Sequence, residues 1–209
     1  MIGQTGDSPT IWLGTANHGE RTAEAVCSAL KNGCMLIDAV LCYLCKQSWS
    51  CLERAYKEGK AKMIGVSNYP AELLEEMKTY AEIMPEVNQI EYHPRLASPE
   101  TYTKCKELGI LMQSNGILNS IQIANPVVSQ MIGPIAKNTN TSPIQTCIRW
   151  AVQNQVCVIF RSGRKENQLS NLASSQGPHL SSEDMGAINA LHENHQYYWL
   201  PESSIQTLD

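Results

Sequence analysis

The sequence predicts an α/β fold in which parallel strands alternate with helices. Short apolar strand patterns recur along the 209-residue chain, and helical patterns with apolar residues three and four positions apart lie between them. The last strand pattern, residues 156–160, is apolar throughout, which suits a strand that is buried on both faces. Such alternation is typical of a parallel sheet covered by helices.

Six strand patterns can be placed in order. They cover residues 10–14, 35–39, 64–67, 87–92, 110–113 and 156–160. The helix after the first strand is expected to end at Gly33, and the helix before the fifth strand at Gly109. Pro70 suits a first helical position, and Ser98 and Ser142 suit N-caps. The segment 125–140 is less regular, because Gly133-Pro134 is expected to break a helix there.

The strand ends favour a TIM-barrel-like fold over an open, doubly wound sheet. Polar residues close most strand patterns at the carboxyl end; they are Thr15, Asp38, Ser67, Asn68, Gln89, Glu91, Gln113, Arg161 and Ser162. A barrel gathers such ends around one mouth, where its active site lies. An open nucleotide-binding sheet would carry G-x-G-x-x-G after its first strand, and the sequence lacks this motif. We expect one domain over residues 1–209.

Composition and charge narrow the function classes. The net charge of −4 provides no basic surface for nucleic acid or an anionic membrane. We see no signal peptide at the start, and the longest apolar run is too short to cross a bilayer. Eight cysteines without a secretion signal predict reduced thiols in a cytoplasmic protein. The C-x-x-C at 42–45 has no second ligand pair, which favours packing over a zinc site.

At its strand ends the sequence resembles the aldo-keto reductase family. The matching stretches are LGT at 13–15, LIDAVLCY at 36–43, EGKAKMIGVSNY at 58–69, VNQIEYHP at 87–94, SSEDMGAINALHEN at 181–194 and YYW at 197–199. The resemblance covers nearly the whole chain, and GVSNY followed by VNQIEYHP at this spacing is highly specific. It implies an eight-stranded (β/α) barrel that uses NADPH to reduce aldehydes and ketones.

Measured against the family pattern, the chain lacks two βα units after Tyr43. The chain passes from Tyr43 through CKQS directly to WSCLERAYKEGK, which resembles the helix before GVSN. The missing units carry the family's catalytic lysine and histidine, and no histidine of this chain lies at a matching position. The resemblance therefore implies about six parallel strands, in a barrel that closes more tightly or stays open between strands 35–39 and 63–67.

By resemblance, Asp38 and Tyr43 are the catalytic residues that remain. Tyr43 matches the proton donor, and Asp38 matches the partner of the missing lysine. An ordinary phenol has a pKa of about 10, and the lysine would have moved that value toward working pH. Lys46 lies in the shortened connection, where a flexible side chain would position its charge poorly. Judged by residue type alone, Asp38 could instead cap the strand end and Tyr43 could be a core aromatic.

More of the family's cofactor-binding residues than of its catalytic residues have counterparts in this chain. By resemblance, Ser67, Asn68 and Gln89 hold the nicotinamide carboxamide, whereas the stacking aromatic of the family falls on Asn115. The remaining matches are Leu118 and Ser120 at the pyrophosphate, Arg161 and Ser162 at the 2′-phosphate, and Asn171 at the adenine. A guanidinium can bind a phosphate through two hydrogen bonds, which favours NADP(H) over NAD(H). A second phosphate-binding arginine falls on Asn167, so we expect weakened binding.

Three functions fit these observations. The first is a carbonyl reductase of low or altered activity. The second is a non-catalytic nucleotide-binding or interaction protein on the reductase scaffold, and the third is a truncated product of splicing or of an imperfect gene model. The expected partners are a nicotinamide dinucleotide and a small carbonyl substrate, without nucleic acid or membrane. The substrate and any protein partner stay open.

Overall fold

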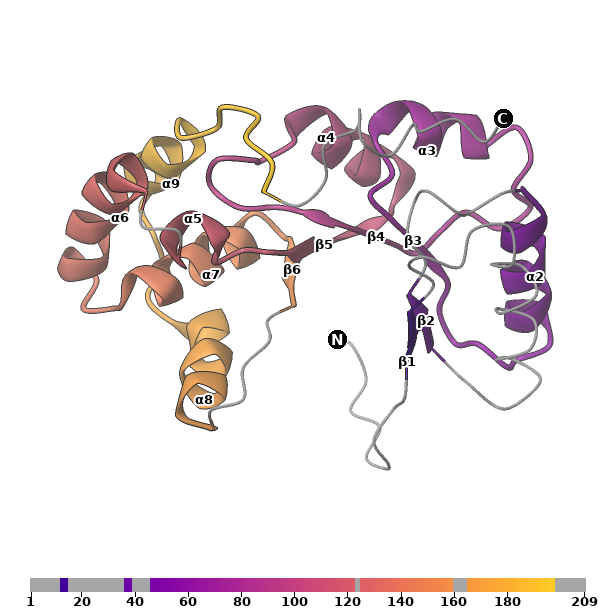
Figure 1. Ribbon diagram of the computed structural model, residues 1–209, viewed down its shortest axis with the longest axis horizontal. Helices are drawn as coiled ribbons and strands as arrows, with labels where there is room; N and C mark the ends of the chain where they lie inside the picture. The colour runs from indigo at the N-terminus through magenta and orange to yellow at the C-terminus, as the bar shows by residue number, and fades with distance from the viewer. Residues whose placement is uncertain (1–11, 15–35, 39–45, 123–124, 160–164, 198–209) are drawn as a thin grey trace. The chain divides into compact units, whose positions relative to one another are not determined.

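A computed structural model describes residues 12–14, 36–38, 46–122, 125–159 and 165–197 of the chain (Figure 1). The chain divides into two compact units. The first unit comprises Met1–Ser67 and Glu72–Val87, and the second comprises Asn68–Ala71 and Asn88–Asp209. The prediction of a single domain over 1–209 stays a prediction.

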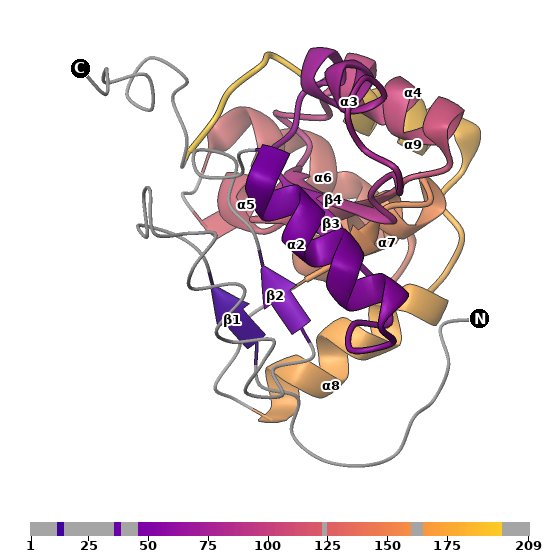
Figure 2. The same cartoon turned by 90° about the vertical axis from the view of Figure 1, so that its right-hand side faces the viewer.

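The six predicted strands are all present. They are β1 (Trp12–Gly14), β2 (Leu36–Asp38), β3 (Gly65–Ser67), β4 (Val87–Glu91), β5 (Leu111–Asn115) and β6 (Cys157–Val158). β1 pairs with β2 in parallel as a two-stranded sheet (Figure 2), and the other four strands follow the order β3-β4-β5-β6. β5 and β6 are also parallel, with Gln113 opposite Cys157. The α/β class is confirmed, and the strands that the structure describes form an open sheet of four and a pair.

Helix α2 (Lys46–Lys57) is firmly attached within the first unit. Trp49 and Leu52 are buried, and the Trp49 indole N–H donates to the backbone carbonyl of Ile83 at 3.1 Å. The carboxylate of Glu53, also buried, accepts the backbone N–H groups of Glu82 and Ile83 at 2.7 and 2.9 Å. Side chains of α2 thus satisfy the backbone N–H groups of Glu82 and Ile83 and the backbone carbonyl of Ile83.

β3 passes very close to the start of β4. The backbone N–H of Glu86 donates to the carbonyl of Ile64 at 2.9 Å. At Gly65 a Cβ atom would lie 2.7 Å from the carbonyl oxygen of Val87. Only a residue without a side chain fits there. Leu74 and Met77 of α3 (Ala71–Met77) are fully buried.

The helices of the second unit supply most of its core. They are α4 (Pro99–Leu108), α5 (Asn119–Gln122), α6 (Pro126–Asn138), α7 (Pro143–Gln153), α8 (Lys165–Ala173) and α9 (Ser182–Asn189), with a 3₁₀ turn at Ser174–Gln176. α6 packs against both α7 and α9 (Figure 1). Trp150 of α7 stacks on Tyr92, with ring centroids 4.8 Å apart and an interplanar angle of 9°. None of the helices in the described ranges is long and apolar enough to span a bilayer.

Two of the predicted helix boundaries are correct. The Ser142 side chain accepts the N–H of Gln145, whose own side chain accepts the N–H of Ser142, so the two form a capping box. Gly109 closes α4 in the left-handed conformation, at φ 68°.

Two other expectations are wrong. Ser98 has φ 41° and makes no side-chain capping bond, so Pro99 begins α4 without one. α6 also continues through Pro134, which leaves the Gln130 carbonyl without its helical N–H partner. The burial of Ile132 and Ile135 on either side of this position explains why the helix persists, because tertiary packing overrides local propensity.

Candidate functional site

Two of the predicted nicotinamide ligands lie together, Asn68 directly after β3 and Gln89 within β4. Asn68 follows β3 in the left-handed conformation, at φ 58°, which asparagine tolerates better than most residues. Its backbone N–H donates to the carbonyl of Gln89 at 2.7 Å. The next residue, Tyr69, exchanges two hydrogen bonds with the Asn88 side chain, at 3.3 and 2.7 Å. These bonds fix the backbone on both sides of the Asn68 side chain.

The Gln89 side chain is half-buried and oriented by its neighbour on β5. Its Nε2 donates to Oε1 of Gln113 at 3.1 Å. This bond uses a donor of Gln89, and none of the residues that the structure describes bonds to its Oε1. The amide oxygen of Gln89 is an acceptor, and the Asn68 side chain carries both an acceptor and a donor; these are the types that complement a primary carboxamide. Ser67, the last residue of β3, is buried in the first unit.

Four other predicted site residues lie in helices, strands or the turns beside them. Asn171 is buried on α8, and Leu118 is half-buried just before α5. Ser120 belongs to α5, and Asp38 ends β2 opposite Gly14. Tyr43, Arg161 and Ser162 lie outside the described residues.

Asn115, which we expected to match the stacking aromatic of the family, ends β5. It is half-exposed, and its backbone carbonyl accepts the N–H of Tyr92 at 3.1 Å. Tyr92 itself cannot supply an acid, because burial raises the pKa of its phenol well above the ordinary value. Its hydroxyl is already bonded to the Asn154 side chain at 3.1 Å.

Lys46 is not in a flexible connection, contrary to expectation. It is the first residue of α2, and its Nζ lies 4.9 Å from the centre of the Tyr80 ring. The helix begins this early because the apolar face formed by Trp49, Leu52 and Ala55 is buried. A cation above an aromatic ring gains about 0.5–1 kcal/mol at an exposed site. This contact holds the Lys46 charge at α2.

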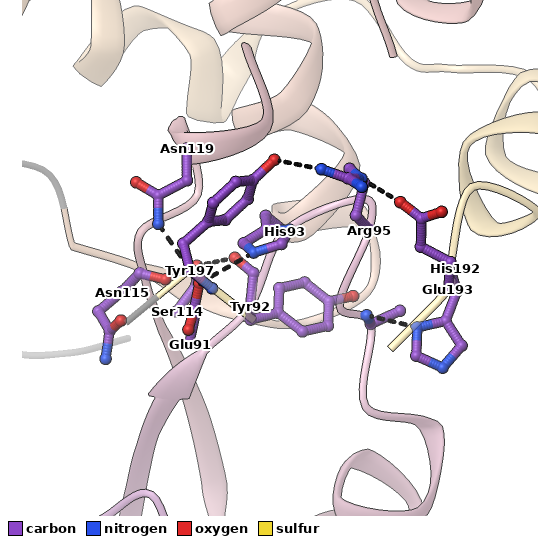
Figure 3. A network of polar contacts seen from close by, with 11 residues as sticks. Glu91, Tyr92, His93, Arg95, Ser114, Asn115, Asn119, His192, Glu193 and Tyr197 are labelled. Carbon is purple, nitrogen blue, oxygen red and sulfur yellow. Dashed lines mark hydrogen bonds and ion pairs between the residues drawn. The ribbon is translucent and has the colours of Figure 1, made fainter. Parts of the chain in front are cut away.

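A buried polar cluster follows β4, and it was missed at the level of sequence (Figure 3). One oxygen of Glu91 accepts from His93 Nε2 at 3.1 Å, from the Tyr197 backbone N–H at 2.9 Å and from Asn119 Nδ2 at 3.5 Å. Glu91 is 4% exposed and His93 is fully buried. The His93 ring also lies 5.0 Å from the Tyr197 ring. The EYHP stretch was the available signal, but it does not reveal a partner as distant as Tyr197.

Arg95 extends this cluster to the chain's last described segment. Its guanidinium lies between the Tyr197 hydroxyl, 2.7 Å from Nη1, and the Glu193 carboxylate, to which its Nε donates (Figure 3). Its backbone carbonyl accepts the N–H groups of Glu193 and His195 at 3.2 and 3.1 Å. Among the described residues, no group of three metal-ligating side chains accompanies these contacts.

Comparison with known proteins decides the family. A sequence profile described as the Aldo/keto reductase family matches residues 45–120. The uncharacterized oxidoreductase YtbE of Bacillus subtilis is 34% identical over 190 residues, which are 88% of this chain and 66% of the relative. The chain belongs to the aldo-keto reductase family. The glyoxal reductase of Bacillus subtilis is 39% identical over 150 residues, 71% of this chain and 52% of that enzyme.

Solved aldo-keto reductase structures share the fold. MGS-M4, an aldo-keto reductase from a Medee basin deep-sea metagenome library, has a TM-score of 0.78 and 28% identity, covering 90% of this chain and 72% of its own. A mutant of Gox0644 in complex with NADPH has a TM-score of 0.72 and 26% identity, covering 87% of this chain and 70% of its own. The chain spans about half to two thirds of the length of the curated relatives named above.

Proposed function

We propose that this aldo-keto reductase family member binds NADPH and reduces reactive aldehydes slowly, with Tyr43 as the proton donor. The observation that carries the proposal is the pair of amides after β3 and within β4, where the Asn68 backbone is bonded to Gln89 and the Gln89 side chain is oriented by Gln113. Family membership and the NADPH complex of a structural relative support the choice of cofactor.

The described residues fit the nicotinamide end of that cofactor. Asn68 and Gln89 would hold the carboxamide together with Ser67. Because the backbone on either side of Asn68 is fixed by hydrogen bonds, this contact would limit rotation of the nicotinamide ring. NADPH, when bound, supplies the hydride. The rest of the dinucleotide would contact Leu118 and Ser120 at the pyrophosphate, Arg161 and Ser162 at the 2′-phosphate, and Asn171 at the adenine. Because Asn115 offers no ring to stack on the nicotinamide, we expect weak binding.

Proton transfer is the step that we expect to limit the reaction. Tyr43 would donate its phenolic proton to the carbonyl oxygen as the oxygen gains negative charge. An ordinary phenol, with a pKa of about 10, is a poor acid at neutral pH, and by resemblance the lysine that would lower this value belonged to the missing units. A well-positioned acid contributes roughly 10²–10⁴-fold to the rate, and much of this contribution is lost here. Asp38 would lack the cation that it pairs with in the family.

We also propose that two βα units are absent between Tyr43 and Trp49. β2 ends at Asp38 and α2 begins at Lys46, so only residues 39–45 lie between them. A single βαβ crossover with its helix needs at least about 10–12 residues. The seven residues between β2 and α2 leave no room for a further strand and helix, which supports a deletion there.

A non-catalytic role is the second candidate. The contact between Lys46 and the Tyr80 ring favours it, because the nearest lysine in sequence to Tyr43 is engaged within α2's own surroundings. Such a protein would bind the dinucleotide, or a partner protein, without catalysing a reaction. A cytoplasmic location, where NADPH is available, remains part of the proposal for either role.

The two candidates are separated by measuring turnover. Glyoxal reduction under saturating NADPH is compared for the unaltered chain, Tyr43→Phe and Lys46→Met, with Tyr56→Phe on α2 as a matched control. We expect a low rate that Tyr43→Phe abolishes and that Lys46→Met and Tyr56→Phe leave unchanged. A rate that survives Tyr43→Phe contradicts the assignment of the proton donor. Cofactor binding without any turnover favours the non-catalytic role.

A further inference from the structure

The segment 191–197, here called the strap, is held against the loop that follows β4. Both lie in the second unit. Three of its four anchoring points involve Arg95 or Glu91: the Arg95 carbonyl accepts two strap N–H groups, its guanidinium binds Glu193 and Tyr197, and Glu91 accepts the Tyr197 N–H. The strap also covers the buried His93, whose ring packs against that of Tyr197 (Figure 3).

The fourth anchoring point is a hydrogen bond to a histidine ring. The backbone N–H of Ala97 donates to Nδ1 of His192 at 3.2 Å. A backbone N–H can only donate, so Nδ1 must carry a lone pair and the imidazole must be neutral. The His192 ring is half-buried, so it is accessible to protons from the solvent.

We propose that acid weakens the attachment of the strap at this fourth anchoring point, and that His192 is the group that responds. A proton taken from solvent onto Nδ1 makes the ring a donor at both nitrogens. Two N–H groups then face each other between His192 and Ala97, and the hydrogen bond is lost. No other bond in the protein has to form or break in this step.

The surroundings of His192 point to this ring in preference to the other titratable groups at the contact. These groups are Glu91, His93 and Arg95 after β4, Glu100 in the first turn of α4, and Glu193, His195 and Tyr197 on the strap. Protonated His93 would still donate to Glu91, so its titration preserves that bond. His195 contacts the Tyr197 ring only edge-on, at 4.7 Å.

Amide hydrogen exchange on the full 209-residue chain tests the proposal. Protection factors, corrected for the intrinsic pH dependence of exchange, are measured for the amides of Ala97, Glu193 and His195 between about pH 7.5 and 5.5, the range in which histidines titrate. We expect protection of these amides to fall roughly two- to tenfold on acidification, the change that corresponds to one hydrogen bond.

Two substitutions of His192 make the result specific. In His192→Asn, Oδ1 replaces Nδ1 as acceptor on the same carbon and cannot be protonated in this range, so protection should persist at pH 5.5. In His192→Ala the acceptor is missing, so protection should already be low at pH 7.5. His195→Asn is the matched control and should behave like the unaltered chain. If His192→Asn loses protection at the same pH as the unaltered chain, another group is responsible and the proposal is overturned.

Discussion

Nε2 of His93 lies 3.1 Å from Oε1 of Glu91, and both side chains are buried. The same oxygen accepts the backbone N–H of Tyr197, which is 106 residues away in the sequence. One carboxylate therefore joins the end of β4 to the last described segment of the chain. A buried carboxylate is tolerated when donors surround it, and each donor in turn depends on the carboxylate.

Removal of this carboxylate should destabilise the protein strongly. Glu91→Ala removes the carboxylate acceptor that donors on His93, Asn119 and Tyr197 share. We expect the free energy of unfolding in urea to fall by about 2–4 kcal/mol. Glu91→Gln, which keeps one oxygen acceptor, should lose less, and Glu76→Ala on the exposed face of α3 should have little effect. Equal losses for Glu91→Ala and Glu76→Ala would show that the cluster does not stabilise the fold.

The attachment of α2 can be tested in the same way. Glu53→Ala removes the acceptor for the N–H groups of Glu82 and Ile83, and we expect a loss of about 1–3 kcal/mol in the free energy of unfolding. Glu58→Ala, an exposed position at the end of the same helix, is the control. If the two variants unfold at the same urea concentration, the 82–83 turn is not held by Glu53.

Stability should also fall at alkaline pH. Burial raises the pKa of the Cys147 thiol above its ordinary value, because the thiolate would lose its hydration. A group whose pKa is higher in the folded state contributes stability that is fully present below the pKa of the unfolded thiol, about 8.5, and is lost as the pH rises above it.

Urea unfolding between about pH 8 and 10 measures this loss, which for one such group approaches about 1.4 kcal/mol per pH unit. Cys147→Ala removes the buried thiol, so its stability should decline less steeply than that of the unaltered chain. Burial raises the pKa of Cys105 as well, and some decline should therefore remain in the variant. Identical slopes for the two proteins would rule out a contribution from Cys147.

Restoring an aromatic ring at the end of β5 should strengthen cofactor binding. In Asn115→Tyr the backbone bond to Tyr92 is retained, and the new ring can stack on the nicotinamide. We expect NADPH to bind more tightly by about 1–3 kcal/mol in a fluorescence titration, if the gain resembles that of base–aromatic stacking. Asn115→Ala should bind as the unaltered chain does. A similar affinity for all three proteins would mean that the nicotinamide does not reach residue 115.

Local features of the chain were predictable from the sequence, because they depend on neighbouring residues. The six strands follow from apolar runs, and the ends of helices at Ser142 and Gly109 follow from side-chain and backbone chemistry within a few positions. Pro134 shows the limit of such reasoning, since the burial of the residues around it outweighs a local break.

Within the candidate site, the juxtaposition of Asn68 and Gln89 was predictable because β3 and β4 follow one another along the chain and are neighbours in the sheet. The cluster around Glu91 was not, since its donors come from segments that sequence alone does not bring together. The position of Lys46 was missed for a different reason. The start of α2 is set by burial of Trp49 and Leu52, and no capping residue marks it in the sequence.

The narrow space at Gly65 limits which residues this position can accept. Every single amino-acid change there introduces a Cβ 2.7 Å from the Val87 carbonyl oxygen, which belongs to rigid backbone and cannot move aside as a side chain could. A mutational scan should therefore accept glycine alone at this codon, and an inherited substitution there should be scored as damaging. Gly186 sits in α9 with nothing within 4 Å of an added Cβ, so alanine at this codon should be accepted and should favour the helix.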